Sequence, residues 1–316
     1  MPQTFRDAKC YRSMLFVPGH KLDWMLKAPK YGPDALILDL EDSVGIGEKP
    51  AARIAIAEAI KELRAEPVGL FVRVNSWRTG CLIDDLSAVV VDGLDGVMLS
   101  KAEDPEDVAA LDLVLGELER SRELSFGSIE ICPYPETALA MYRLYEICMA
   151  SQRVKRAGAA TGPNPGGDGG RSLGLQFEEE GAVEGVAFGA YSVLQARAAG
   201  IVQIEGAMTG RLDDLDLVRR NCQKSKRMGA SFASAIHPSH IPIINEIYSP
   251  SQEEVDEARG VVSALAEGIA RGQAAVRYNS KLVDFANVRT AMDVLKKAEA
   301  AGMNIGDVPK IEIPAY

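Results

Sequence analysis

Several features that would place this chain in a specialised class are missing from its sequence. The five cysteines are scattered and include no C-x-x-C pair, which argues against a zinc site of that type and against a dithiol redox motif. Such a set is typical of free thiols in a reducing compartment. No run of about 18 apolar residues is present, and the amino-terminal M-P-Q-T-F-R-D-A-K-C-Y-R lacks the apolar stretch of a secretory signal. We therefore expect a cytoplasmic protein.

Positive charge is also in short supply. The chain has 35 lysines and arginines against 45 aspartates and glutamates, which gives a formal net charge of −10. A negative mean field disfavours broad contact with a nucleic-acid backbone or an anionic membrane. We expect no nucleic-acid partner and no membrane partner, and an anionic ligand must meet a local basic cluster.

Histidine is scarce, with only His20, His237 and His240 in the chain. No H-E-x-x-H motif or nucleophile elbow accompanies them, so hydrolysis by a Ser-His-Asp triad is poorly supported. The chain also lacks a P-loop and the G-x-G-x-x-G turn of dinucleotide-binding folds. His237, directly before Pro238, is expected to maintain local geometry rather than to act as a base.

The chain does contain an alternation of short apolar runs with stretches of helical periodicity. Its composition, 47% hydrophobic and 25% charged residues, is that of an ordinary globular protein. The alternation predicts an α/β fold with a parallel sheet and helical crossovers. Eight units fit a (β/α)8 TIM barrel better than an open doubly wound sheet. The expected strands are residues 13–17, 35–40, 69–74, 96–101, 128–132, 157–161, 200–204 and 232–237, and the clearest helices are 50–65, 105–120, 136–150 and 212–228.

The pattern changes after the eighth expected strand. We place a boundary at residue 248, with the barrel in residues 1–248 and a helical extension in residues 249–316. Ser251 and Glu254 form a capping-box pattern at the start of a helix, and a second helical stretch covers residues 283–300. The extension is too small for a secure core of its own. We expect it to act as a lid that packs on the barrel or on a neighbouring subunit.

Charged residues follow the expected strands at the ends where such barrels carry their active sites. Glu136 and Asp168 close neighbouring β/α units, so the two carboxylates are expected to share a hard cation. Two carboxylates that leave positions open suit Mg²⁺. Each residue also has an ordinary alternative, because Glu136 can complement a helix dipole and Asp168 can belong to an Asp-Gly turn.

Arg73 ends a strand and presents a planar fork that suits a carboxylate or a developing oxyanion. Its alternative is a structural ion pair with Asp39 or Asp42. Asp39, Glu41 and Asp42 lie at the end of the preceding strand. Most of these acids are expected to orient Arg73 or Lys101. Of the three, Glu41 is the catalytic candidate. Lys101 is expected to be ion-paired rather than to form a Schiff base.

Five segments in a fixed order add to this interpretation. They are R-S-M-L-F-V-P-G at residues 12–19, L-D-L-E-D-S-V at 38–44, V-R-V-N at 72–75, E-T-A at 136–138 and A-I-H-P at 235–238. Together they resemble the citrate lyase β-subunit-like, or HpcH/HpaI aldolase, superfamily over nearly the whole chain. The N-S-K-L-V-D segment at 279–284 resembles the G-K-M-V-D segment of the stand-alone CoA-ester lyases in that superfamily, such as the malyl-CoA and citramalyl-CoA lyases.

The resemblance implies a role for each matching residue. It makes Glu136 and Asp168 the ligands of Mg²⁺, or of Mn²⁺ in its place, and makes Arg73 a catalytic, substrate-orienting arginine. It assigns Asp284 as an acid/base from a neighbouring protomer, in a homotrimer or hexamer. Arg12 and Lys27 fall where the family holds the CoA phosphates. The family's F-G-x-E-D sequence before the metal aspartate is replaced here by an altered loop at residues 162–168.

The implied activity is that of a Mg²⁺-dependent carbon–carbon lyase. It would cleave or form a 3-hydroxyacyl-CoA thioester, such as malyl-CoA or citramalyl-CoA, from an acyl-CoA and a 2-oxo acid through a thioester enolate. One alternative is an aldolase on free 4-hydroxy-2-oxo acids. Others are a citrate lyase β-type subunit that docks an acyl-carrier protein and a degenerate ligand-binding relative. The presence of Glu136, Asp168 and Arg73 argues against the degenerate ligand-binding relative.

Overall fold

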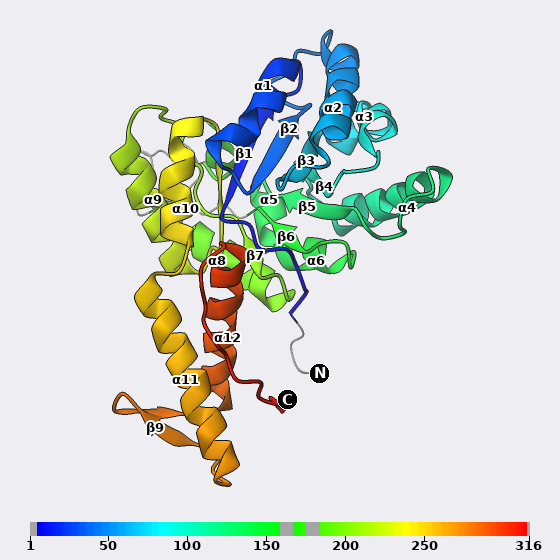
Figure 1. Ribbon diagram of the computed structural model, residues 1–316. Helices are drawn as coiled ribbons and strands as arrows, with labels where there is room; N and C mark the ends of the chain where they lie inside the picture. The colour runs from blue at the N-terminus through cyan, green and yellow to red at the C-terminus, as the bar shows by residue number, and fades with distance from the viewer. Residues whose placement is uncertain (1–4, 159–166, 175–183, 315–316) are drawn as a thin grey trace. The chain divides into compact units, whose positions relative to one another are not determined.

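A computed structural model describes residues 5–158, 167–174 and 184–314 (Figure 1). Contacts divide the chain into two compact units, one that ends at Tyr248 and one that begins at Ser249. Among the described residues, no helix combines the length and the apolar character needed to cross a bilayer.

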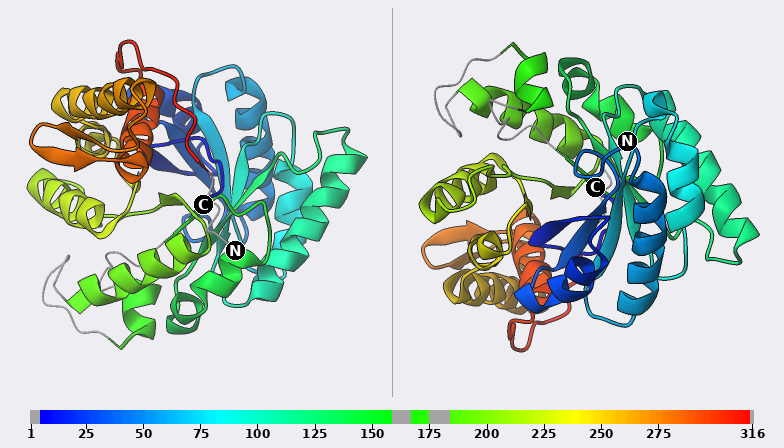
Figure 2. Two further views of the ribbon diagram at one scale, coloured as in Figure 1. Left: turned by 90° about the horizontal axis from the view of Figure 1, so that it is seen from below. Right: turned by 90° about the horizontal axis from the view of Figure 1, so that it is seen from above.

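The first unit is built on a curled parallel sheet of six strands (Figure 2). The sheet has the order β5-β4-β3-β2-β1-β8, so each of the first five strands lies next to its neighbour in the chain. This order confirms the parallel α/β architecture. The strands are β1 (Ser13–Pro18), β2 (Ala35–Asp39), β3 (Gly69–Val74), β4 (Gly96–Ser100), β5 (Glu130–Tyr134) and β8 (Ala233–Ala235).

The closed eight-stranded barrel is not confirmed. Strands β6 (Arg156–Ala157) and β7 (Gln203–Ile204) form a separate parallel pair of two residues each. Single bridges connect this pair to the sheet, from Ile131 to Val154 on one side and from Glu205 to Phe232 on the other. The expected strand 157–161 falls mainly outside the described residues, as does most of the loop at 162–168.

Helices cover the outer face of the sheet (Figure 2). The expected helix at 136–150 is divided at Arg143 into two short helices, and Thr137 caps the first of them through the backbone N–H of Ala140. The helices of this unit are α1 (Leu22–Lys27), α2 (Lys49–Leu63), α3 (Leu82–Val89), α4 (Pro105–Ser121), α5 (Ala138–Tyr142), α6 (Leu144–Met149), α7 (Asp168–Ser172), α8 (Glu184–Ala198), α9 (Leu215–Met228) and α10 (Ile241–Tyr248).

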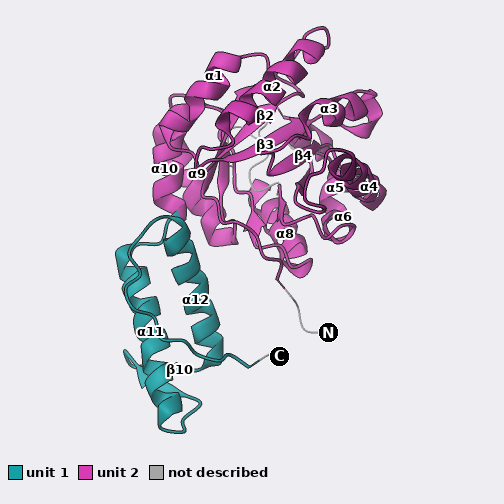
Figure 3. Ribbon diagram, turned by 45° about the vertical axis from the view of Figure 1, so that its right-hand side comes forward, with its two compact units in different colours: residues 1–2, 249–316 teal, residues 3–248 magenta. Residues whose placement is uncertain are grey.

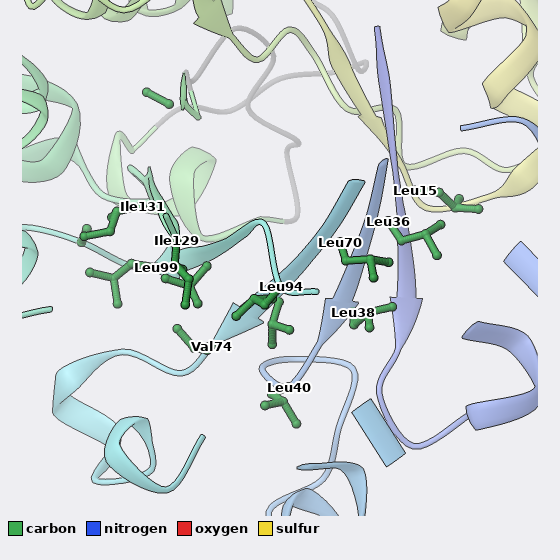
Figure 4. Close-up of a cluster of buried hydrophobic side chains, with 14 of the residues drawn as sticks. Leu15, Leu36, Leu38, Leu40, Leu70, Val74, Leu94, Leu99, Ile129 and Ile131 are labelled. Carbon is green, nitrogen blue, oxygen red and sulfur yellow. The ribbon is translucent and has the colours of Figure 1, made fainter. Parts of the chain in front are cut away.

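The alternation of side chains along each strand separates the core from the site. In β2, Leu36 and Leu38 belong to the apolar cluster packed with the helices (Figure 4), whereas Ile37 belongs to a second cluster on the inner face. Because side chains alternate with a period of two, Asp39 points to the same face as Ile37. By the same rule Arg73 shares the face of Phe71 in β3. Two charged side chains therefore reach the inner face at the carboxyl ends of adjacent strands.

The amino end of the inner face is filled by a buried arginine. Arg156 is fully buried, donates to Glu130 at 2.8 Å, and lies over the rings of Tyr11 and Phe71. An arginine that is paired and packed in this way occupies the interior without an unbalanced charge. The carboxyl end of the strands is consequently the end available for chemistry.

The second unit is a helical hairpin with a small β-ribbon (Figure 3). It contains α11 (Gln252–Ala270), β9 (Val276–Tyr278), β10 (Lys281–Val283) and α12 (Phe285–Ala300), with a buried cluster of its own. The predicted capping box of Ser251 and Glu254 is confirmed. The ribbon was not predicted; its turn uses Asn279 and Ser280 at φ of 44° and 62°, the left-handed region required by tight hairpins.

Candidate active site

Arg73 and Asp39 form the centre of the candidate site. The two residues are register partners in the β2–β3 pair, and Arg73 donates from Nε at 2.6 Å and from Nη2 at 2.7 Å to the two Asp39 carboxylate oxygens. Burial by itself would raise the pKa of Asp39, but the hydrogen bonds and charge of Arg73 outweigh it and lower that pKa. The arginine is thus oriented by a bidentate contact in a fixed register.

Glu41 joins this pair to a second cation. Its Oε2 lies 3.0 Å from Nη1 of Arg73, and its Oε1 accepts from Nζ of Lys101 at 2.7 Å. Lys49 donates to the backbone oxygens of Leu40 and Glu41, which holds the loop that carries the carboxylate. Burial raises the pKa of Glu41, although Arg73 and Lys101 oppose the shift.

Lys101 brings Asp168 into the same cluster. Its Nζ lies 3.1 Å from Oδ2 of Asp168 and 3.6 Å from Oδ1 of Asp42, in addition to its bond to Glu41. Burial alone would lower the pKa of Lys101, but the hydrogen bond and charge of Glu41, followed by Asp168, raise it. The expectation that this lysine is ion-paired is confirmed. The structure therefore places Asp168 and Glu41 on the same ammonium group, although Asp168 follows a different strand.

Glu136 lies between β5 and α5, close to the same charges. The loop is held by Ala138, whose N–H donates at 2.9 Å to Oγ of Ser172 in α7, the short helix that Asp168 begins. Oε2 of Glu136 is buried and has no hydrogen-bond partner among the residues that the structure describes. Burial, reinforced by Glu41 and only partly offset by Arg73, raises the pKa of Glu136 to about 7. A buried carboxylate oxygen without a hydrogen-bond donor is a candidate metal ligand.

The donor set fits a hard divalent cation bound by few protein ligands. The described residues contain no group of three or more histidine, cysteine or acidic side chains arranged around one point as a metal site. Glu136 and Asp168 can supply two carboxylates, and Mg²⁺ typically takes one or two such ligands together with water and substrate oxygens. Lys101 is the cation that faces Asp168, whereas no described residue donates a hydrogen bond to Oε2 of Glu136.

The two residues expected to hold CoA phosphates lie in different places. Arg12 precedes β1, at the amino end of the sheet, where Asp34 accepts from its Nε at 2.9 Å and from its Nη2 at 2.7 Å. The structure therefore does not bring Arg12 to the carboxyl-end cluster, because a parallel strand separates its two ends by its whole length. We make no assignment of Arg12 to substrate binding.

Lys27, in contrast, lines a pocket of about 410 Å³ beside the carboxyl ends of β1 and β8. Phe16 also lines the pocket, and its ring centroid lies 5.0 Å from the guanidinium carbon of Arg73, so the pocket adjoins the cluster. The remaining side chains are mainly aromatic and apolar. They are Leu15, Val17, Pro18, Trp24, Ala28, Tyr31, Ile236, His237 and Pro238.

Asp284 belongs to the second unit, where it caps α12. Its Oδ1 accepts from the N–H groups of Ala286 at 2.9 Å and of Asn287 at 3.3 Å, and Asn287 returns a bond to the Asp284 N–H. Asp284 is partly exposed, so a second role at the surface is compatible with capping.

Sequence reasoning did not assign Glu205 to the site. This residue follows β7 and is 1% exposed. Burial raises the pKa of Glu205 to about 7, although hydrogen bonds with Ser234 and Tyr134 oppose the shift. The available signal was its position, because Glu205 follows its strand much as Glu136 follows β5.

Glu205 makes the stability of the first unit depend on pH. A carboxyl whose folded pKa exceeds its unfolded value binds more protons in the folded state, so stability falls as pH rises from about 4.5 to about 7. As pH rises from 5 to 8, the free energy of unfolding of Glu205→Gln should therefore increase by roughly 2 kcal/mol relative to that of wild type. Urea unfolding in EDTA measures this difference, with the exposed Glu58→Gln as control. A difference that does not change with pH would contradict the expectation.

The fold and the cluster together define a class: an α/β enzyme with a paired arginine and two carboxylates at the carboxyl ends of a curled parallel sheet. The family model described as HpcH/HpaI aldolase/citrate lyase matches residues 12–238. The chain therefore belongs to the HpcH/HpaI aldolase/citrate lyase family, as the sequence motifs predicted, and it is a lyase.

Its relatives include two kinds of lyase. The chain is 32% identical to the citrate lyase subunit beta of Escherichia coli over 94% of this chain and 96% of the relative. It is 30% identical to the L-malyl-CoA/beta-methylmalyl-CoA lyase of Cereibacter sphaeroides over 92% and 96%. It also resembles the crystal structure of the protein CitE from Mycobacterium tuberculosis in complex with magnesium, acetoacetate and coenzyme A. That likeness has a TM-score of 0.66 and 26% identity, and covers 92% of this chain and 98% of the other.

Proposed function

We propose that this protein is a Mg²⁺-dependent carbon–carbon lyase that acts on a 3-hydroxyacyl-CoA thioester such as malyl-CoA or citramalyl-CoA. It would cleave the thioester into an acyl-CoA and a 2-oxo acid, or catalyse the reverse reaction. The observation that carries the proposal is the buried Glu136 oxygen, which has no donor in the described part of the chain, in a cluster that also holds Arg73 and Asp168. The similarity to a malyl-CoA lyase and to a structure that holds magnesium and CoA supports it.

Glu136 and Asp168 would hold the cation. When bound, Mg²⁺, or Mn²⁺ in its place, supplies Lewis-acid polarisation of the oxo acid's carbonyl oxygen and neutralises its carboxylate. The surrounding residues exclude water from one side of Glu136, which is why its free carboxylate is costly without a cation.

Arg73 would stabilise the enolate. Cleavage of the bond between carbons 2 and 3 removes the proton of the 3-hydroxyl group and leaves an electron pair on the thioester enolate. Arginine has five N–H donors, of which two bond Asp39 and one faces Glu41, so donors remain for the enolate oxygen. Since both oxygens of Glu41 face cations, we assign this residue a positioning role rather than direct contact with the reacting atoms.

The pocket lined by Lys27 would bind the CoA portion. An ammonium group at the rim of an aromatic pocket suits a phosphate next to a pantetheine chain or an adenine ring. Trp24 and Tyr31 are 55% and 44% exposed, so their rings are accessible to a ligand in this pocket. Because Phe16 contacts both the pocket and Arg73, a thioester bound there would lie next to the cluster.

The second unit would complete the site of a neighbouring subunit. Asp284 would accept the proton of the 3-hydroxyl group during cleavage and return it to carbon 2 of the enolate, in a homotrimer or hexamer. Leu282, two residues earlier, is 72% exposed and is accessible to a second subunit. The bridges on both sides of the β6–β7 pair support a closed eight-stranded arrangement for the barrel that Asp284 would face.

Arg73→Lys should lower kcat/KM by about 10²-fold or more. A point charge cannot reproduce a planar fork that bonds Asp39 and an enolate oxygen together. The loss should appear in kcat, since the enolate forms only during the reaction. Steady-state kinetics measure it, with the exposed Arg64→Lys as control. Wild-type kcat/KM in Arg73→Lys would reassign the residue to a structural ion pair.

The decisive experiment is an assay of the isolated protein with CoA thioesters and with free 4-hydroxy-2-oxo acids, in Mg²⁺ and in EDTA. We expect turnover of a thioester only, and only with Mg²⁺. Turnover of free acids would instead establish the aldolase alternative.

A citrate lyase β-type activity is the second candidate, because the chain is 32% identical to such a subunit. In that case the isolated protein would be inactive with CoA thioesters and active with the same acyl group on an acyl-carrier protein. A substitution in the pocket at Lys27 also distinguishes the CoA-ester lyase from the citrate lyase β-type activity. For a CoA-ester lyase, Lys27→Ala should raise KM for free CoA esters through the loss of a phosphate contact.

A further inference from the structure

Lys101 faces the carboxylate side of the cluster in an unusual backbone conformation. It follows β4 with a φ of 52°, in the left-handed region that residues other than glycine rarely adopt. From there its Nζ reaches Glu41, Asp168 and Asp42 at 2.7, 3.1 and 3.6 Å. A single ammonium group thus forms ion pairs with carboxylates from two separate loops.

The balance of charge explains why this contact matters. Among the described residues, the ion pairs of the cluster are made by two cations, Arg73 and Lys101, whereas the cluster holds five carboxyl groups. Arg73 is committed to Asp39 and Glu41, so Lys101 is the positive charge nearest to Asp168. The five carboxyl groups are those of Asp39, Glu41, Asp42, Glu136 and Asp168.

We propose that Lys101 acts as an internal counter-cation that occupies Asp168 when the metal is absent and competes with the metal for that carboxylate. The inference rests on the proposed metal site and concerns its regulation. A divalent cation on Asp168 would be repelled by the ammonium group now 3.1 Å from the same oxygen. The side chain is 29% exposed, so it can leave Asp168 while it keeps its shorter bond to Glu41. Metal binding is then an exchange, which weakens the affinity for the metal and keeps binding reversible, while Asp168 keeps a counter-charge in the metal-free protein.

Calorimetric titration of the full chain with MgCl₂ at pH 8 tests the exchange without any assay of activity. Lys101→Met should bind Mg²⁺ roughly tenfold more tightly than wild type, because the competing charge is gone. Lys101→Arg keeps the charge and should bind within about threefold of wild type. Lys61→Met, which removes an exposed charge from α2, should leave the affinity unchanged.

Thermal unfolding provides a second readout. Without metal, Lys101→Met should melt several degrees below wild type, because its carboxylates lack a partner, and saturating Mg²⁺ should remove most of that gap. If this variant does not fold, Lys101→Gln retains a hydrogen-bond donor to Glu41 and gives the same comparison. Equal or weaker Mg²⁺ affinity in the folded neutral variant would overturn the role of Lys101. Absence of Mg²⁺ binding to wild type would instead overturn the proposed metal site itself.

Discussion

Glu136→Gln is expected to lower Mg²⁺-dependent turnover by at least about 10²-fold while the protein stays folded. The amide keeps the shape of the side chain but removes the negative charge that a hard cation requires. Its effect on stability should be small or favourable near pH 8. The raised pKa of Glu136 shows that the ionised group is disfavoured in the metal-free protein.

Three measurements separate loss of metal from loss of fold. Calorimetry should show that Glu136→Gln and Asp168→Asn bind Mg²⁺ much more weakly than wild type, and circular dichroism should show unchanged helix content. Glu146→Gln removes an exposed carboxylate from α6 and should behave like wild type. Full activity of wild type in EDTA, or of Glu136→Gln in Mg²⁺, would refute the metal site.

Removal of the Asp284 carboxylate is expected to cost roughly 10²–10⁴ in rate with substrate binding largely retained. The structure makes the test sharper than a simple alanine substitution, because Asp284 also caps α12. Loss of a cap costs about 1 kcal/mol, which alone would leave turnover unchanged. Asp284→Asn preserves capping, since asparagine is an equally good cap, and should still lose the rate.

Asn287→Ala is the matched control. It removes the reciprocal bond of the same capping box, at 2.9 Å to the Asp284 N–H, but leaves the carboxylate in place. We expect a lower melting temperature with nearly normal turnover. If Asp284→Asn kept wild-type kcat, the residue would be a helix cap and nothing more.

Mixed oligomers test whether Asp284 acts in the site of a neighbour. Asp284→Asn and Glu136→Gln protomers are each expected to be inactive, but a mixed assembly would contain some sites with both wild-type residues. Partial recovery of activity on mixing is therefore expected. No recovery after demonstrated subunit exchange would show that the site is not shared between subunits.

Much of the first unit could be predicted from the sequence, because the signals are local. The run G-L-F-V-R-V is apolar with one charged residue near its end, and the structure shows β3 over Gly69–Val74, the residues predicted. Ser251 and Glu254 are three residues apart, so their reciprocal bonds form inside one helical turn. The short length of β7, two residues where residues 200–204 were expected, was not predicted, because its pairing depends on neighbours distant in the chain.

By itself, the sequence determined which residues are charged at the strand ends and which family the motifs indicate. Only the tertiary structure decided which charges meet. The β2–β3 register sets Asp39 against Arg73, and two loops converge on Lys101 to bring Asp168 and Glu41 together. It also left Arg12 at the opposite end of the sheet with Asp34. The reason is that strand periodicity specifies the face on which a side chain lies, whereas ion pairs depend on register and loop closure between distant segments.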